Sequence, residues 1–279
     1  MSPLENKHNI STKELEEDLT RLKGIVSADE IRLLGGEPLL NDELASLATV
    51  VKRSGIGNKV TISTNGILLN KWRDSEILWN LIDECEVSIY DTQRCNPELI
   101  VSDCIYISKI YGVTFYIYYC SMFRQAGAFE KCDDFEMTRM LFESCILSKM
   151  WQCFNIFEGR FYLCPQAIGF SRFNPNVDVK TNSVSLNSSS LKDDINNFIE
   201  RKEPLPACSY CYGCVGKICR HEQISRKEYL SDFQMGFGLD RIDTSFLDKI
   251  RKRGGDGFLS LETIEKTKII EKGRIRERN

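Results

Sequence analysis

The spacing of four short apolar runs is the feature that most constrains the fold of this chain. Helical stretches are expected between these runs, and strand–helix units of this kind are typical of parallel strands joined by crossover helices. Right-handed crossovers would curl them towards a barrel or an open α/β sheet. Only four units are clear, so a closed eightfold barrel does not fit. The strand candidates begin near Glu30, Lys59, Glu86 and Val113, at intervals of 29, 27 and 27 residues.

Local signals flank these units. Ser11 and Glu14 form a capping-box pattern that predicts a helix running to about Leu22. Glu158-Gly159 lies between two apolar segments and predicts a β-hairpin turn. Residues 174–197 are rich in Asn, Ser and Asp, and this composition predicts a long loop or a loosely held insertion.

Small and polar residues follow the first three strand candidates. Gly35-Gly36-Glu37-Pro38 ends the first, Ser63-Thr64-Asn65-Gly66 ends the second, and Ser88 lies near the end of the third. Paired glycines mark ordinary turns. They also let a ligand approach main-chain N–H groups, and ligands of α/β proteins bind at the carboxyl ends of strands. We therefore expect these residues to face one side of the sheet.

The two motifs together, Gly35-Gly36-Glu37-Pro38-Leu39 and Ser63-Thr64-Asn65-Gly66, resemble the radical S-adenosylmethionine (radical SAM) superfamily. The resemblance implies a partial (β/α) barrel in which the Gly-Gly-Glu segment contacts the methionyl amino group. It also implies that the Thr-Asn-Gly strand end lies near the same ligand and that the third strand end faces the ribose. The cofactor-binding residues implied in this way are Gly35, Gly36, Glu37, Pro38, Thr64, Asn65 and Ser88. A turn at Ser88 without any ligand is the alternative.

One part of the superfamily pattern is missing. The Cys-x3-Cys-x2-Cys loop that normally precedes the Gly-Gly-Glu region does not occur in this sequence. The resemblance therefore implies an N-terminally truncated barrel, in which S-adenosylmethionine binding is weak or lost.

Composition and charge limit the partners and the compartment that we expect for this chain. Hydrophobic residues make up 42% of the 279 positions, and 37 basic residues balance 40 acidic ones for a net charge of −3. This balance gives no reason to expect nucleic acid or an anionic membrane as a partner. No apolar run approaches the ~20 residues of a membrane span, and the N-terminus lacks a signal core, so we expect a cytoplasmic protein. In a reducing compartment the twelve cysteines are not expected to form disulfides, so metal or iron–sulfur ligation competes with plain buried thiols as their role.

Four of these cysteines form a pattern with metal-ligand spacing. Cys153 and Cys164 lie at the two bases of the predicted hairpin, and Cys208 and Cys211 follow as a Cys-x2-Cys pair. Four thiolates suit either tetrahedral zinc or a [4Fe–4S] cluster, and the spacing does not choose between them. A second possibility is the run Cys208, Cys211, Cys214, Cys219, which approaches the bacterial ferredoxin spacing but has a last gap one residue too long.

The same pattern resembles the auxiliary-cluster module (SPASM or twitch-like) that follows many radical SAM barrels. On this resemblance Cys153, Cys164, Cys208 and Cys211 are the ligands of an auxiliary [4Fe–4S] cluster, and Cys145 and Cys214 are reserves. The remaining cysteines are scattered on expected helices and strands and are interpreted as ordinary thiols, namely Cys85, Cys95, Cys104, Cys120 and Cys132.

These expectations divide the chain into a partial α/β barrel over 1–125, a cysteine-rich hairpin domain over 126–225 and a peripheral tail over 226–279. Two functions are compatible with them. The first is a radical SAM enzyme acting on an undetermined small-molecule or peptide substrate, once the missing loop is restored. The second is a non-catalytic, degenerate or truncated protein that binds iron–sulfur or zinc.

Overall fold

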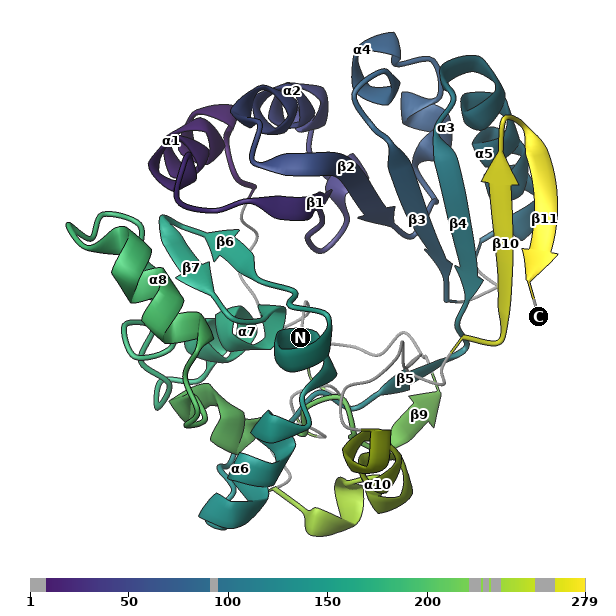
Figure 1. Cartoon of the computed structure of the whole chain (residues 1–279). Coiled ribbons are helices and arrows are strands. Elements are labelled where there is room, and N and C mark those ends of the chain that lie inside the picture. The colour runs from purple at the N-terminus through teal and green to yellow at the C-terminus, as the bar shows by residue number, and fades with distance from the viewer. Residues whose placement is uncertain are drawn as a thin grey trace. The chain divides into compact units, whose positions relative to one another are not determined.

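The computed structural model describes residues 9–90, 95–220, 227, 231, 237–253 and 264–278 (Figure 1). They have a mixed α/β fold and form two compact units. One, here called the sheet unit, contains the described residues between 9 and 122 together with 264–278. The other, the cysteine unit, contains the described residues between 123 and 253.

A six-stranded, largely parallel sheet organises the sheet unit (Figure 1). Its first four strands are mutually parallel, as the repeating pattern predicts, whereas the last two add as antiparallel neighbours. Among the described strands β1 and β11 form the edges, so the sheet is open. In order across the sheet the strands are β1 (Ala28–Leu33), β2 (Gly57–Thr64), β3 (Glu84–Ile89), β4 (Thr114–Tyr119), β10 (Lys266–Glu271) and β11 (Arg274–Arg278).

The helices of this unit begin and end at recognisable caps. The Ser11–Glu14 capping box is present, with the Ser11 backbone N–H donating to the Glu14 carboxylate over 2.8 Å, and the predicted helix is confirmed. The predicted helix over 97–111 is also confirmed, with Asn96 as its N-cap and Gly112 in the left-handed conformation after its end. The helices are α1 (Thr12–Leu22), α2 (Leu44–Ser54), α3 (Leu69–Trp72), α4 (Glu76–Trp79) and α5 (Pro97–Tyr111), with a 3₁₀ turn at Pro38–Leu40.

Alternation along the strands gives the sheet two different faces. On β3 the residues Cys85, Val87 and Ile89 alternate with less buried residues and are themselves buried. The rings of Trp79 from α4 and Phe115 from β4 are 6.0 Å apart and fully buried in the same layer. Burial of these aromatic and β-branched side chains against the helices supplies the main stabilisation of the unit.

The opposite face of the sheet carries charged and polar side chains. Arg32 on β1 forms ion pairs with Glu30 and with Glu86 on β3, and the Ser63 hydroxyl donates to Glu86 over 3.1 Å. Burial raises the pKa of Glu86 above its usual value, although Arg32 acts in the opposite direction. The parallel registers place these groups side by side across three strands, so this face is a network of paired charges.

None of the helices in the described parts of the chain is long and apolar enough to cross a membrane.

The cysteine unit is built from short elements. Three strands form a small antiparallel sheet, β6 (Asn155–Phe157), β7 (Arg160–Tyr162) and β8 (Val184–Ser185), and β5 (Met122–Arg124) pairs with β9 (Ile218–Arg220). The helices are α6 (Phe135–Glu143), α7 (Pro165–Phe173), α8 (Leu191–Ile199) and α10 (Thr244–Arg253), with a π-helical turn at Ile146–Met150 and 3₁₀ turns at Pro206–Tyr210 and Leu239–Arg241.

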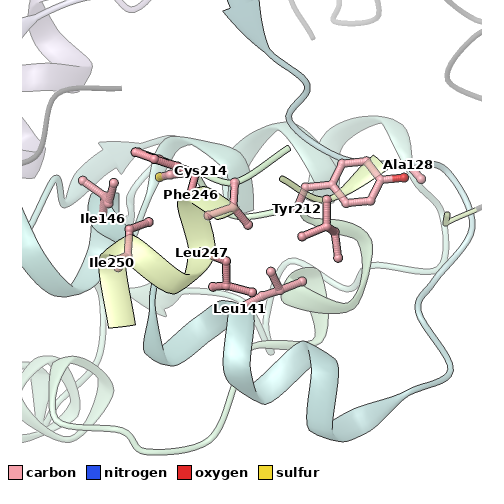
Figure 2. Packing of buried hydrophobic residues seen from close by; sticks show 10 residues of the cluster. Ala128, Leu141, Ile146, Tyr212, Cys214, Phe246, Leu247 and Ile250 are labelled. Atoms are coloured by element: carbon pink, nitrogen blue, oxygen red, sulfur yellow. The ribbon is translucent and has the colours of Figure 1, made fainter. Parts of the chain in front are cut away.

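A hydrophobic cluster joins distant parts of the cysteine unit. Figure 2 shows Phe246, Leu247 and Ile250 of α10 beside Leu141 of α6 and Tyr212. All five are almost fully buried. Residues separated by about a hundred positions in the sequence therefore share one core in this unit.

The predicted hairpin is confirmed, because β6 and β7 pair across Glu158-Gly159, both of which have positive φ angles. The segment 174–197 differs from the expected loose insertion, since it contains β8 and most of α8. Hydrogen bonds of its polar residues hold this segment in place. Buried Asn182 accepts from the Ala207 backbone N–H over 2.8 Å and donates to the Asp178 carbonyl over 2.7 Å.

The described residues within 226–279 also differ from the peripheral tail that their mixed charges predict. Helix α10 supplies three core residues to the cysteine unit. Strand β10 pairs with β4, and its Ile270 is fully buried in the sheet unit. Charged residues such as Arg274 lie on β11, an edge strand of the described sheet, where charge resists pairing with other chains.

Candidate metal centre

Four cysteine side chains line one small cavity in the cysteine unit. They are Cys145, Cys164, Cys208 and Cys211, and the cavity has a volume of about 30 Å³. The rest of its wall is mainly apolar, with Leu141, Phe142, Leu147, Leu163, Phe170 and Leu205 among the lining residues. Three of the four thiols are ones that the sequence pattern predicts as ligands, and the fourth, Cys145, is one of the two reserves.

Short turns hold these cysteines in place. Cys145 precedes the π-helical turn at Ile146–Met150, and Cys164 follows β7 and caps α7. Cys208 lies in the 3₁₀ turn at Pro206–Tyr210, and the Cys211 backbone N–H closes this turn by donating to the Cys208 carbonyl over 3.1 Å. A Cys-x2-Cys spacing therefore places two thiols on one side of a single tight turn.

The thiols influence each other electrostatically. Burial raises the pKa of Cys208 to about 12, and the neighbouring Cys145 thiol contributes in the same direction. Burial also raises the pKa values of Cys164 and Cys211, with Cys145 the next contributor for Cys164 and Cys164 the next for Cys211. Burial therefore disfavours the thiolate forms of these three residues, and a second buried negative charge would repel the first. A bound cation would have to displace the protons.

Cys145 has a different environment from the other three. The pKa of Cys145 lies below its usual value, mainly because of a hydrogen bond with the side chain of Cys214. Cys214, the other reserve ligand, belongs to the hydrophobic cluster and is not among the residues that line the cavity. Cys145 thus lines the thiol cavity and also contacts the hydrophobic cluster through Cys214.

Two cations lie beside the cavity. The Lys149 ammonium donates to the Arg201 carbonyl over 3.1 Å and lies 4.1 Å from the centre of the Phe142 ring. Burial lowers the pKa of Lys149, and Cys145 and Cys208 act in the opposite direction. Burial lowers the pKa of Arg201 as well, and Cys208 opposes this shift. Neither residue can be identified as part of the site by cysteine spacing.

The structure does not place Cys153 among the residues that line the cavity. The β6–β7 pairing ends with Asn155 opposite Tyr162, two positions before the cysteines. Beyond this pairing Gln152 has a positive φ of 49° and Cys164 is the N-cap of α7, so neither Cys153 nor Cys164 belongs to the paired strand residues. The role of Cys153 as a ligand stays a prediction, and so does that of Cys219, which lies on β9 outside the cavity lining.

Within the described part of the chain, no group of three or more His, Cys, Asp or Glu side chains is arranged to hold a metal ion. The four thiols are therefore identified as neighbours by the cavity that they line. Of the cysteines interpreted as ordinary thiols, Cys85, Cys104 and Cys120 are buried, and Cys95 and Cys132 are partly exposed.

The strand ends of the sheet unit form a second group. The Glu37 carboxylate accepts three hydrogen bonds, from the Leu39 backbone N–H over 3.0 Å, the Thr64 hydroxyl over 2.6 Å and the Asn65 backbone N–H over 2.9 Å. The prediction that the Gly-Gly-Glu and Thr-Asn-Gly segments lie at one end of the sheet is confirmed for these residues. Ser88 belongs to the same end, because Thr64 pairs with Val87 in the parallel register.

Part of this motif has a purely structural role. Gly66 has a φ of 76°, and a Cβ at this position would lie 2.7 Å from Val87 Cγ1 and 2.8 Å from Ile100 Cγ2. Glycine is therefore required at Gly66 by packing alone. Gly35, in contrast, has open space where its Cβ would be, and Pro38 is a buried first residue of the 3₁₀ turn. Binding of a cofactor by Gly35, Gly36, Glu37, Pro38, Thr64, Asn65 and Ser88 stays a prediction.

We expect Glu37→Ala to lower the free energy of unfolding of the sheet unit by about 2–3 kcal/mol, because the hydroxyl and two backbone N–H groups lose a charged acceptor. Denaturant unfolding measures the change. Glu16→Ala is the matched control, since Glu16 is exposed on α1, and it should stay within about 0.5 kcal/mol. Equal stabilities of the two variants would contradict a structural role for the Glu37 carboxylate.

No family model matches this chain, and no curated protein matches its sequence.

Proposed function

We propose that the cysteine unit binds an iron–sulfur cluster of the [4Fe–4S] type through Cys145, Cys164, Cys208 and Cys211. The observation that carries the proposal is that these four thiols line a single small cavity with an apolar wall. Four cysteine thiolates are the usual donor set for such a cluster, which supplies one-electron transfer when bound. On this proposal the protein is a metal-binding protein whose centre lies in the cysteine unit.

The choice of a cluster over a single zinc ion rests on the resemblance of the hairpin and the Cys-x2-Cys pair to the auxiliary-cluster module. Four thiolates suit either centre by their chemistry alone.

The charges around the cavity also suit an anionic centre. Four thiolates bring more negative charge than the iron–sulfide core neutralises, so the site needs nearby cations or N–H donors. Lys149 and Arg201 supply the cations beside Cys145 and Cys208. The Gly213 backbone N–H donates to the Cys211 sulfur over 3.2 Å. The apolar wall limits the access of water, which favours retention of a bound cluster.

We further propose that the sheet unit is related to the partial barrels of radical SAM proteins. The specific observation in favour is the Glu37 carboxylate, which joins the two motif segments at one end of parallel strands. A carboxylate offers about four acceptor positions, and three are used by Leu39, Thr64 and Asn65. One position therefore stays available for an ammonium group such as that of S-adenosylmethionine. The open sheet would form part of such a barrel.

Metal analysis of anaerobically purified protein tests the main proposal. The full-length chain is expected to be brown and to contain about four iron atoms and about four labile sulfides per molecule. Iron, sulfide and zinc are measured on the same sample against total protein. Colourless protein with about one zinc per chain would establish a zinc site instead. Protein free of both metals after reconstitution with iron and sulfide would show that the four thiols are structural.

We expect the chain in its present form to release no 5′-deoxyadenosine from S-adenosylmethionine. The reductive cleavage that the radical SAM resemblance implies depends on the Cys-x3-Cys-x2-Cys loop, and this motif does not occur in the sequence. Dithionite-reduced, reconstituted protein is incubated with S-adenosylmethionine and the products are separated by chromatography. Turnover above a protein-free control would favour the enzyme, and its lack would favour a non-catalytic metal-binding relative.

A further inference from the structure

A second hollow in the cysteine unit is lined by basic side chains. It is an open depression of about 590 Å³, here called the basic depression. Its charged lining consists of Arg160, Lys180 and Arg201 against the single carboxylate of Asp194. Its volume falls in the range of about 300–1,000 Å³ that is common for small-molecule sites. No motif of the sequence points to it, because its residues are spread over 160–201.

Arg160 is held in a fixed orientation within the basic depression. Its Nε donates to the Ser183 hydroxyl over 2.6 Å, and one Nη donates to the Ser183 carbonyl over 3.3 Å. Ser183 is itself buried, and its hydroxyl donates to the Val179 carbonyl over 2.5 Å. A guanidinium has five N–H donors. Two of these five N–H groups donate to Ser183, and the other three form no hydrogen bond to a described residue.

Arg201 is fixed in a similar way from another element. Its Nε donates to the Glu203 carbonyl over 2.8 Å and one Nη to the Pro204 carbonyl over 3.5 Å. Its guanidinium carbon lies 5.4 Å from the centre of the Phe198 ring. Arg201 is half-buried, and this burial lowers its pKa.

The charges in the basic depression are not balanced by the protein. Asp194 accepts hydrogen bonds from the hydroxyls of Ser188 and Ser190 at Oδ2, and it is the single carboxylate against three cations in this lining. Neither arginine forms an ion pair with a carboxylate in the described ranges, and the same is true of Lys180. The Glu203 carboxylate acts on Arg201 only at longer range, without an ion pair. Lys131, by contrast, pairs with Asp133 on the surface.

We propose that the basic depression binds a small, multiply charged oxyanion ligand that carries phosphate or carboxylate groups. Arg160 and Arg201 offer planar pairs of N–H donors, which match the spacing of two oxygens on one phosphate or carboxylate group. Lys180 adds a third positive charge at the exposed rim, and Ser185, Ser188 and Asn197 line the depression with further polar groups. The ordering cost of binding is small because the protein already orients both arginines.

Isothermal titration calorimetry at constant ionic strength tests this binding. Pyrophosphate and citrate are the two probes for phosphate and carboxylate chemistry, and the full-length chain is expected to bind at least one of them saturably, one molecule per chain. A glutamate-rich peptide is the third probe. Binding of the peptide alone, or no saturable binding of any probe, would overturn the proposal.

Variants locate the site. Arg160→Gln is expected to weaken binding at least about tenfold, because charged hydrogen bonds are lost. Lys180→Gln is expected to weaken it about threefold. Lys180 is exposed, so this variant still decides the matter if Arg160→Gln does not fold. Lys131→Gln removes one charge elsewhere in the unit and should change nothing. Equal binding by Lys180→Gln, Lys131→Gln and the unaltered protein would place the anion elsewhere. Neither Arg160 nor Lys180 lines the thiol cavity, so the result does not depend on a cluster.

Discussion

Cys145→Ala is expected to remove most of the iron from anaerobically purified protein, whereas Cys153→Ala is expected to retain it. Cys145 lines the thiol cavity with Cys164, Cys208 and Cys211, and Cys153 does not. Loss of one of four thiolates exposes a corner of the cluster. The expected loss of affinity therefore exceeds the about 10–100-fold that removal of an outer partner costs. Iron and labile sulfide per chain are measured for both variants.

These two variants form a matched pair, because each removes one thiol that the sequence pattern offers as a ligand. Cys208→Ala is the positive control, since Cys208 belongs to both candidate ligand sets. Metal binding couples to folding, so Cys145→Ala should also unfold at lower temperature under anaerobic conditions. Loss of iron from Cys153→Ala together with full iron in Cys145→Ala would establish the hairpin ligand set of Cys153, Cys164, Cys208 and Cys211.

Residue spacing predicts some of the cavity cysteines but does not distinguish Cys145 from Cys153. Pairs such as Cys208 and Cys211 can be predicted, because three residues of one turn determine their separation. The partner that completes the set depends on where the chain leaves the hairpin. Pro165 marks the start of α7 in the sequence, but the positive φ of Gln152 on the other side of the hairpin has no sequence signal. The basic depression cannot be predicted from residue spacing either, because its lining residues come together only when β7, β8 and α8 fold.

The parallel strands of the sheet unit can be predicted from the sequence because their signals are local. Each strand and the helix after it form a local unit, and caps such as Ser11 and Asn96 mark the helices directly. Strand β10 has no such signal, because its sequence Lys-Thr-Lys-Ile-Ile-Glu lacks a regular alternation and its partner, β4, lies about 150 positions earlier. Pairing over this separation depends on tertiary packing, which a single sequence window does not contain.

Phe246→Ala is expected to lower the free energy of unfolding of the cysteine unit by about 3–5 kcal/mol. Phe246 is 1% exposed and packs in the cluster of Figure 2 with residues of α6 and with Tyr212. Its ring centre also lies 4.0 Å from the Arg124 guanidinium carbon, so the substitution removes a cation–π contact as well. The void cannot close easily, because Leu247 and Ile250 of the same helix are fixed in the cluster.

Hydrogen exchange measured peptide by peptide separates the two units in this experiment. Peptides from α6 and α10 should lose protection in Phe246→Ala, and peptides from β2 and β3 of the sheet unit should keep theirs, because the two units have separate cores. Phe135→Ala is the matched control: it makes the same deletion at a residue that is 55% exposed at the start of α6, and it should stay within about 0.5 kcal/mol. Unchanged exchange in α6 after Phe246→Ala would mean that α10 is a peripheral element, as the charge pattern of this region predicts. Loss of protection in α6 would instead establish α10 as part of the core on which the thiol cavity is built, since Leu141 of α6 lines that cavity and also belongs to the cluster.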